Sequence, residues 1–62
     1  MTTDLPEIGQ VARRELAAHG ITTLEEVARR TEQELLAIHG VGPKAVRILR
    51  EALAATGRSL QP

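Results

Sequence analysis

The sequence predicts an all-α domain of four to five short helices, on three observations. Apolar residues recur at helical spacing, a threonine is followed three residues later by glutamate at two places, and single glycines follow the apolar runs. No stretch alternates apolar and polar residues as a half-buried strand does. With 62 residues, we expect one domain over 1–62, close to the size at which a core alone can hold a fold.

The first helix is predicted over residues 10–19. A turn at Gly9 precedes it, and Ala12 and Leu16 lie on one face at helical spacing. Gly20 is expected to end it, because glycine commonly follows the last residue of a helix.

Two threonine caps predict the next helices. Segment 22–26 offers a threonine with a glutamate three residues on, in either of two registers, and starts a helix of about two turns through residue 30. Segment 31–34 is a second capping box and starts a helix that runs to Ile38.

The longest apolar stripe predicts the last helix, over residues 43–55. Pro43 suits the first helical position, where its missing N–H leaves no bond unmade. Gly57 is expected to close the helix, and residues 58–62 are expected to form a frayed tail. The stripe consists of Ala45, Ile48, Leu49, Ala52 and Leu53.

The segment 38–49 carries the clearest functional pattern. Gly40 can end the preceding helix with a positive φ, and Gly42 can cap the next one without a side chain in front of it. The first amides of a helix lack intrahelical acceptors and lie at the positive end of its dipole. The amides of Gly42, Lys44 and Ala45, with the Lys44 ammonium beside them, therefore predict a small phosphate site.

Charge is distributed unevenly along a chain whose formal net charge is zero. Residues 39–58 carry four basic residues and one acidic one, whereas residues 1–38 carry four basic and seven acidic ones. An anionic ligand should therefore meet the C-terminal part. The absence of aromatic residues removes base-stacking platforms and weakens a single-strand-binding hypothesis.

No residue pattern indicates catalysis or metal binding. The chain has no cysteine, and its histidines, His19 and His39, match no metal-ligand spacing. The carboxylates alternate with arginines and form no paired arrangement suited to acid–base chemistry. We expect no catalytic residue, no metal and no cofactor.

The chain also carries an internal repeat at a spacing of 33 residues. Six positions of the first half align with residues of the same kind in the second, four of them identical. The pairs are Leu5 with Ile38, Ile8 with Val41, Gly9 with Gly42, Ala12 with Ala45, Arg14 with Arg47, and Leu16 with Leu49. Two turn-plus-helix units joined by a connector are expected. The halves differ at Glu7, which takes the place of Gly40, and at Val11, which takes that of Lys44.

The pattern Ile38-x-Gly40-Val41-Gly42-x-x-Ala45-x-x-Ile48 resembles the helix-hairpin-helix motif of DNA-binding proteins, and residues 5–12 resemble a degenerate copy. The chain is similar to the tandem domain of that family, and also to the C-terminal domain of the bacterial RNA polymerase α subunit. The resemblance implies a SAM-like fold with motif 1 over about residues 5–20, a connector over 21–34 and motif 2 over about 35–57.

The resemblance further implies non-sequence-specific binding of double-stranded DNA across the minor groove, through backbone amides and basic side chains that meet phosphates. Such a domain would be an accessory module in DNA repair, recombination or transcription. Because the Glu7 carboxylate stands where a phosphate would approach, the first motif is expected to be the weaker. The residues implied by position are Gly40, Val41, Gly42, Lys44 and Arg47 in the second motif, and Ile8, Gly9 and Gln10 in the first. Two further candidates come from the residues themselves: His39, which lies in the second turn, and Arg13, whose charge can partly replace the lysine that the first motif lacks.

Several alternatives stay open at this point. The two glycines of the second motif can serve turn geometry alone, Arg47 and Arg50 can form a solvated helix face, and His39 can touch phosphate or cap a helix end. The neutral total charge also allows a protein-interaction module that docks on a larger partner. We favour DNA binding, and we expect a cytoplasmic monomer with no membrane association, associated with the nucleoid if it binds DNA.

Overall fold

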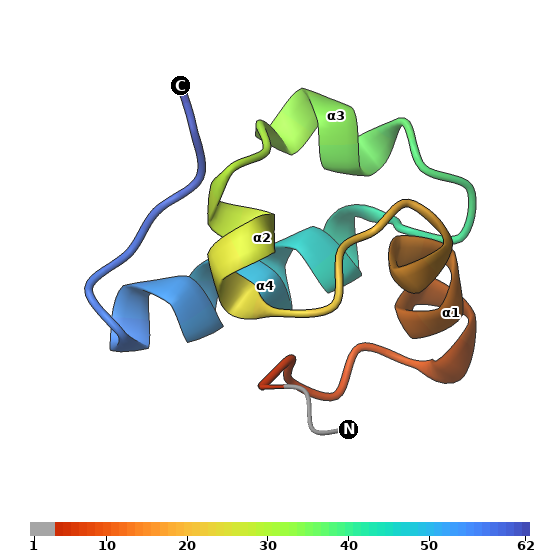
Figure 1. Ribbon diagram of the computed structural model, residues 1–62, viewed down its shortest axis with the longest axis horizontal. Coiled ribbons are helices and arrows are strands. Elements are labelled where there is room, and N and C mark those ends of the chain that lie inside the picture. The colour runs from red at the N-terminus through yellow and green to blue at the C-terminus, as the bar shows by residue number, and fades with distance from the viewer. Residues whose placement is uncertain (1–3) are drawn as a thin grey trace.

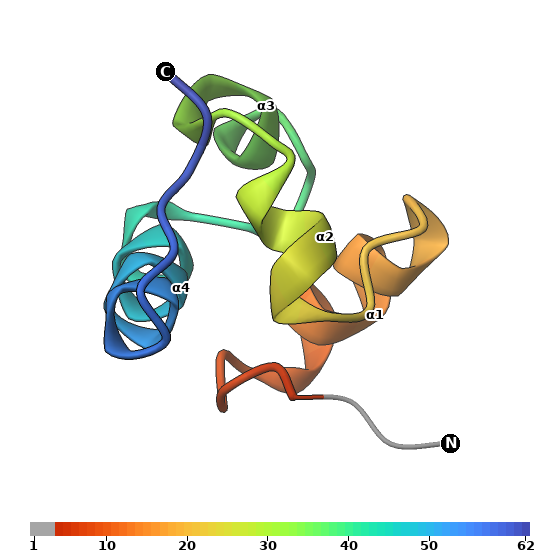
Figure 2. The ribbon, with the colours of Figure 1, turned by 60° about the vertical axis from the view of Figure 1, so that its left-hand side comes forward.

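Four helices make up the fold of the computed structural model, which describes residues 4–62. They are α1 Gln10–Ala18, α2 Leu24–Ala28, α3 Glu32–Leu36 and α4 Pro43–Ala55. The two short helices α2 and α3 pack against α4, and α1 approaches the turn that leads into α4 (Figure 1; Figure 2). Within residues 4–62 there is no strand, only an isolated bridge between Thr31 and Gln61. The all-α prediction is confirmed.

Threonine caps start both short helices. The Thr31 hydroxyl accepts a hydrogen bond from the Glu34 amide at 3.0 Å, and the Glu34 carboxylate accepts one from the Thr31 amide at 2.9 Å, which completes the predicted capping box. For α2 the structure selects Thr23 as the cap, whose hydroxyl accepts from the Glu26 amide at 3.2 Å. Hydrogen bonds from the backbone N–H and then the hydroxyl of Thr22 lower the pKa of the Glu26 carboxyl.

The helix ends also follow the predicted glycines. α1 ends at Ala18, one residue earlier than predicted, and the Ile21 amide after Gly20 donates back to the Leu16 carbonyl at 2.8 Å. The Ile21 side chain is fully buried, so this C-cap also anchors the chain in the core. The same arrangement of hydrogen bonds, centred on Gly57, ends α4.

The N-terminal residues before α1 are tied to the middle of the chain. An Asp4 carboxylate oxygen accepts a hydrogen bond at 2.8 Å from the amide of Leu24, the first residue of α2. Leu5 and Ile8 pack against the core from the same segment. These contacts hold the segment before α1 in place along the lower edge of the domain in Figure 1, and its residues 7–9 line one groove together with the start of α4.

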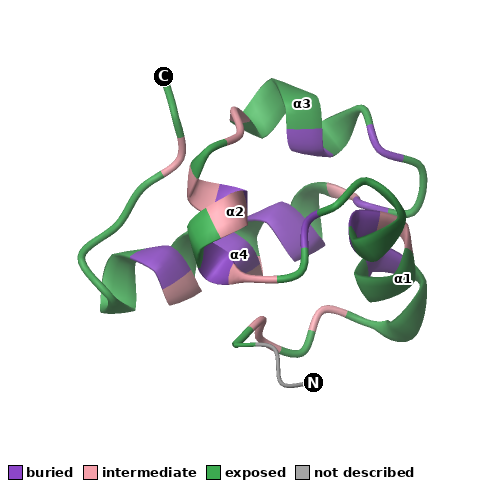
Figure 3. Ribbon diagram, in the orientation of Figure 1, coloured by how far each residue is buried: buried purple, intermediate pink, exposed green. Residues whose placement is uncertain are grey.

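The core draws on all four helices and on the turns between them, as Figure 3 shows. Along α4 the buried stripe differs from the predicted one: Val46 is buried, whereas Ile48 and Ala52 are only half-buried. The reason is that both α2 and α3 pack on α4, so the face of α4 that they cover includes Val46. The buried residues are Ala12, Leu16, Ile21, Leu24, Val27, Leu35, Ile38, Val41, Ala45, Val46, Leu49 and Leu53.

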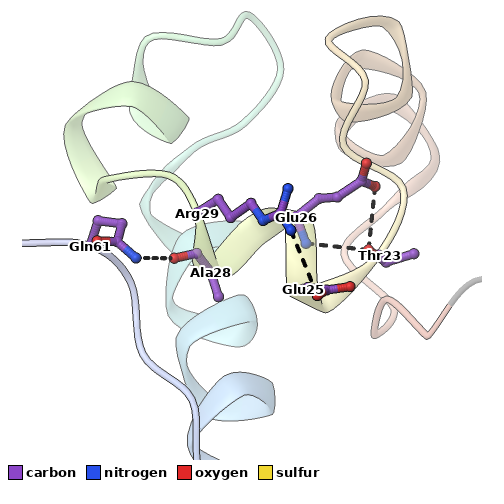
Figure 4. A network of polar contacts seen from close by, with 6 residues as sticks. All are labelled: Thr23, Glu25, Glu26, Ala28, Arg29 and Gln61. Carbon is purple, nitrogen blue, oxygen red and sulfur yellow. Dashed lines mark hydrogen bonds and ion pairs between the residues drawn. The ribbon is translucent and has the colours of Figure 1, made fainter.

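The C-terminal tail is docked, so the prediction of a frayed tail is wrong. The Gln61 amide donates to the Arg30 carbonyl at 3.0 Å, and its side-chain amide donates to the Ala28 carbonyl at 3.0 Å. Figure 4 shows this second bond beside the exposed Arg29–Glu25 ion pair of α2. Leu60 also packs against the core. The tail is therefore held by one apolar contact and by hydrogen bonds to backbone carbonyls near the end of α2, which the helix itself leaves without a donor.

Candidate nucleic-acid interface

The second turn, residues 37–42 between α3 and α4, has the geometry that its glycines predict. α3 ends at Leu36, two residues earlier than predicted, and Gly40 has a φ of +87°. Gly42 is the N-cap of α4 with extended dihedral angles, φ −103° and ψ −177°, and Pro43 occupies the first helical position. The Val41 side chain points into the core and anchors the turn.

The amides of this turn are not all available to a ligand. The Val41 amide donates to the Ile38 carbonyl at 3.1 Å, so it is engaged inside the turn. Those of Gly42, Lys44 and Ala45 have no acceptor among residues 4–62. A β-carbon built on Gly42 would meet no atom within 4 Å, so this side of the turn is open. The start of α4 therefore has three free donors; Gly42 and Lys44 are not buried, whereas Ala45 is buried and reaches the surface only where it lines a groove.

The first turn, residues 7–9 before α1, differs from the second. Gly9 is the N-cap of α1 with a φ of +96°, and no helix precedes it within residues 4–9. Glu7 itself has no positive φ, and its carboxylate accepts a hydrogen bond from the Gly9 amide at 3.1 Å. The Gly9 amide corresponds to the Gly42 amide of the second turn. In the first turn this amide is engaged by the Glu7 carboxylate and is not free for a phosphate.

A single groove of about 540 Å³ joins the two turns. Its lining includes one acidic and one basic residue, Glu7 and Lys44, and the apolar residues Ile8 and Ile48. We call it the shared groove; it is lined by Glu7, Ile8, Gly9, Gly40, Gly42, Pro43, Lys44, Ala45 and Ile48. The sequence alone did not indicate that Ile8 and Ile48 line one groove, although Ile8 belongs to the repeat and Ile48 to the motif.

Close packing between the second turn and α1 shapes the groove. A β-carbon at Gly40 would lie 2.8 Å from the Val11 Cγ1 and 3.3 Å from the Glu15 Cγ. Only a glycine lets α1 approach the turn this closely. Val11 is otherwise an exposed apolar residue, so this contact explains its presence on the surface of α1.

The basic side chains predicted for the site divide into two groups. Lys44 and Arg47 are exposed on α4 and form no ion pair within residues 4–62, whereas Arg50 lies 3.4 Å from the Glu32 carboxylate. Arg13 borders a small hollow on α1 and does not line the shared groove. Lys44 therefore lines the same groove as Gly42 and Ala45 of the second turn and α4, whereas Arg13 lies outside this groove.

The other predicted site residues lie outside the shared groove. His39 is exposed in the second turn, and its side chain makes no hydrogen bond within the described residues. Gln10, the first residue of α1, is exposed as well. Arg47 lies farther along α4 and lines a second groove, described below.

A helix, a glycine turn and a second helix that opens with proline form a helix-hairpin-helix unit, and the comparison with family models agrees. The model of the SAM-like helix-hairpin-helix tandem family matches residues 2–55. The chain belongs to this family. Comparisons with curated proteins and with solved structures found no match.

Two further features of residues 4–62 bear on the kind of site. None of the helices there has the length and apolar character needed to cross a membrane. In the same part of the chain, no three histidine or carboxylate side chains gather in a way that could hold a metal ion.

Proposed function

We propose that the domain binds double-stranded DNA without sequence specificity, through the second turn and the start of α4. The observation that carries this proposal is the group of three free amides at an open glycine, in a groove that Lys44 also lines. Backbone amides contact phosphates and carry no sequence information, so binding through them is independent of base sequence. The family is one of binding domains rather than catalytic ones, which fits this role.

The charge and spacing of the basic side chains suit a phosphate backbone. Lys44 and Arg47 are three residues apart on α4, so they lie on one side of the helix and can meet neighbouring phosphates of one strand. Few cations are involved and the total charge is zero, so we expect weak binding that is lost at high salt. The family resemblance adds the minor groove as the docking site and an accessory role in repair, recombination or transcription.

Replacing Lys44 or Arg47 by alanine tests this proposal. Each change is expected to weaken binding about equally on unrelated duplexes and to reduce the slope of log affinity against log salt by about one. Fluorescence anisotropy of a labelled duplex between low and moderate salt measures both quantities. Arg29→Ala is the matched control, because Arg29 is an exposed arginine directly after α2 that pairs with Glu25 and lines neither the shared groove nor the groove along α4.

Two results of that titration would contradict DNA binding. One is the absence of binding by the unsubstituted protein at low salt, and the other is equal binding by the Lys44, Arg47 and Arg29 variants. The alternative function, docking on a protein partner, is favoured by the Glu7–Gly9 hydrogen bond, which blocks one of two turns. Capture of a partner that survives both nuclease treatment and Lys44→Ala would support this alternative.

Glu7→Gln is expected to strengthen duplex binding about three- to fivefold, by removing about 1 kcal/mol of repulsion from the shared groove. Glutamine keeps a side-chain oxygen for the Gly9 amide, so the turn itself should not change. The same anisotropy titration measures the effect, with Glu25→Gln on α2 as the control. Equal affinities of the two variants would mean that the first turn lies away from the DNA.

A further inference from the structure

A second groove, of about 530 Å³, lies between α4 and the residues that follow it. Three arginines line it, and Glu51 is its one acidic residue. We call it the arginine groove; the lining residues that matter here are Arg47, Arg50, Arg58, Glu51, Ala54 and Leu60. Arg47 stands at its near end, toward the second turn, because it follows the start of α4 by about one turn.

The docked tail builds this groove. After Gly57 reverses the chain, the Arg58 amide donates to the Leu53 carbonyl at 2.8 Å, which fixes the backbone of Arg58 beside the end of α4. Leu60 packs on the core and Gln61 is hydrogen-bonded to the end of α2. Arg58 is therefore held next to the arginines of α4 by contacts that do not involve its own side chain.

The chemistry of the groove suits phosphate. Guanidinium groups bind phosphate oxygens through two parallel hydrogen bonds, which gives arginine an advantage over lysine at such sites. Arg47 and Arg58 form no ion pair within residues 4–62. Arg50 is paired with Glu32, but both side chains are more than half exposed, and an exposed pair of this kind is weak enough to open for a ligand.

We propose that the arginine groove is a second phosphate site, which carries the backbone of the bound duplex beyond the second turn. Arg47 links the two sites, because it follows Lys44 by one helical turn and also lines the groove. α4 has 13 residues and so is about 20 Å long, enough to follow several successive phosphates. This inference rests on the proposed function, since it extends the same interface.

A residue-resolved NMR titration with an unlabelled duplex tests the proposal. The backbone amides of Gly42 and Lys44 report on the second turn, and those of Arg58 and Ser59 report on the arginine groove. Both pairs are expected to shift with one dissociation constant. In Arg58→Ala, the salt slope is expected to fall by about one, as for a lost phosphate contact. The variant keeps the amide that bonds to Leu53, and Arg29→Ala again serves as control.

The possible outcomes separate this inference from the proposed function. If the Gly42 and Lys44 amides shift while those of Arg58 and Ser59 do not, the arginine groove is not a phosphate site and the second turn still is. If neither pair shifts, both proposals are overturned. If only the Arg58 and Ser59 amides shift, the groove binds phosphate and the second turn is not the docking site. The same titration with inorganic phosphate, at the phosphate concentration that the duplex supplies, shows whether binding in the arginine groove requires the DNA backbone.

Discussion

Gly42→Asp is expected to reduce duplex binding more than tenfold while leaving the domain at least as stable. Gly42 has dihedral angles that any residue adopts, and a side chain there would meet no protein atom. Aspartate is a favoured N-cap and interacts well with the helix dipole, so the free energy of unfolding should rise by about 0.5 kcal/mol. The added carboxylate takes the free amides of Lys44 and Ala45 and repels phosphate.

This substitution separates binding from folding, because the two quantities are expected to change in opposite directions. Anisotropy with a labelled duplex gives the affinity, and thermal unfolding followed by circular dichroism gives the stability. Gly42→Asn is the matched control: its side-chain oxygen can accept from the same amides but adds no charge, so it is expected to lose affinity as well, though less than aspartate, and the difference measures the repulsion of phosphate by the carboxylate. Binding of the aspartate variant at the level of the unsubstituted protein would show that these amides are not the phosphate site.

Gly40→Ala is expected to destabilise the domain by about 2 to 4 kcal/mol. A φ of +87° costs a residue other than glycine about 1–3 kcal/mol, and the new methyl group would lie 2.8 Å from the Val11 Cγ1. A domain of 62 residues has a total stability of about 3–9 kcal/mol, so a large share would be lost. Urea unfolding measures the change.

A double substitution divides this loss into its two causes. Val11→Ala removes the atom that the Gly40 methyl group would strike, so the double variant should recover the steric part and keep the backbone part. Val11 is half exposed, so its own truncation should cost little. An unfolding midpoint of Gly40→Ala equal to that of the unsubstituted protein would contradict the close approach of α1 to the second turn.

The helices could be predicted because their signals are local. A threonine three residues before a glutamate, a proline at a first helical position and a glycine after an apolar run each act within one turn of helix, and all are used here as predicted. Val46 and the docked tail could not be predicted in this way. Both depend on which elements cover α4 and on where the carbonyls at the end of α2 lie, and these are properties of the folded chain.

The candidate site was predictable in part for a similar reason. Gly42, Pro43 and Lys44 specify the start of one helix, so the free amides there follow from the sequence. The engagement of the Val41 amide by Ile38 and the bond between Glu7 and Gly9 needed the actual turn conformations. The shared groove needed the packing of α1 against Gly40, which joins residues more than twenty positions apart.

The docking of Gln61 on the end of α2 also determines where an added label would sit. A fluorophore or peptide joined after Pro62 would begin beside α3, on the side of the domain away from the first turn (Figure 1; Figure 2). Such a label leaves the shared groove clear, but it begins two residues after Leu60, which lines the arginine groove. The segment that leads into α1 lies next to that groove, so a label placed on it would interfere with the binding it is meant to measure.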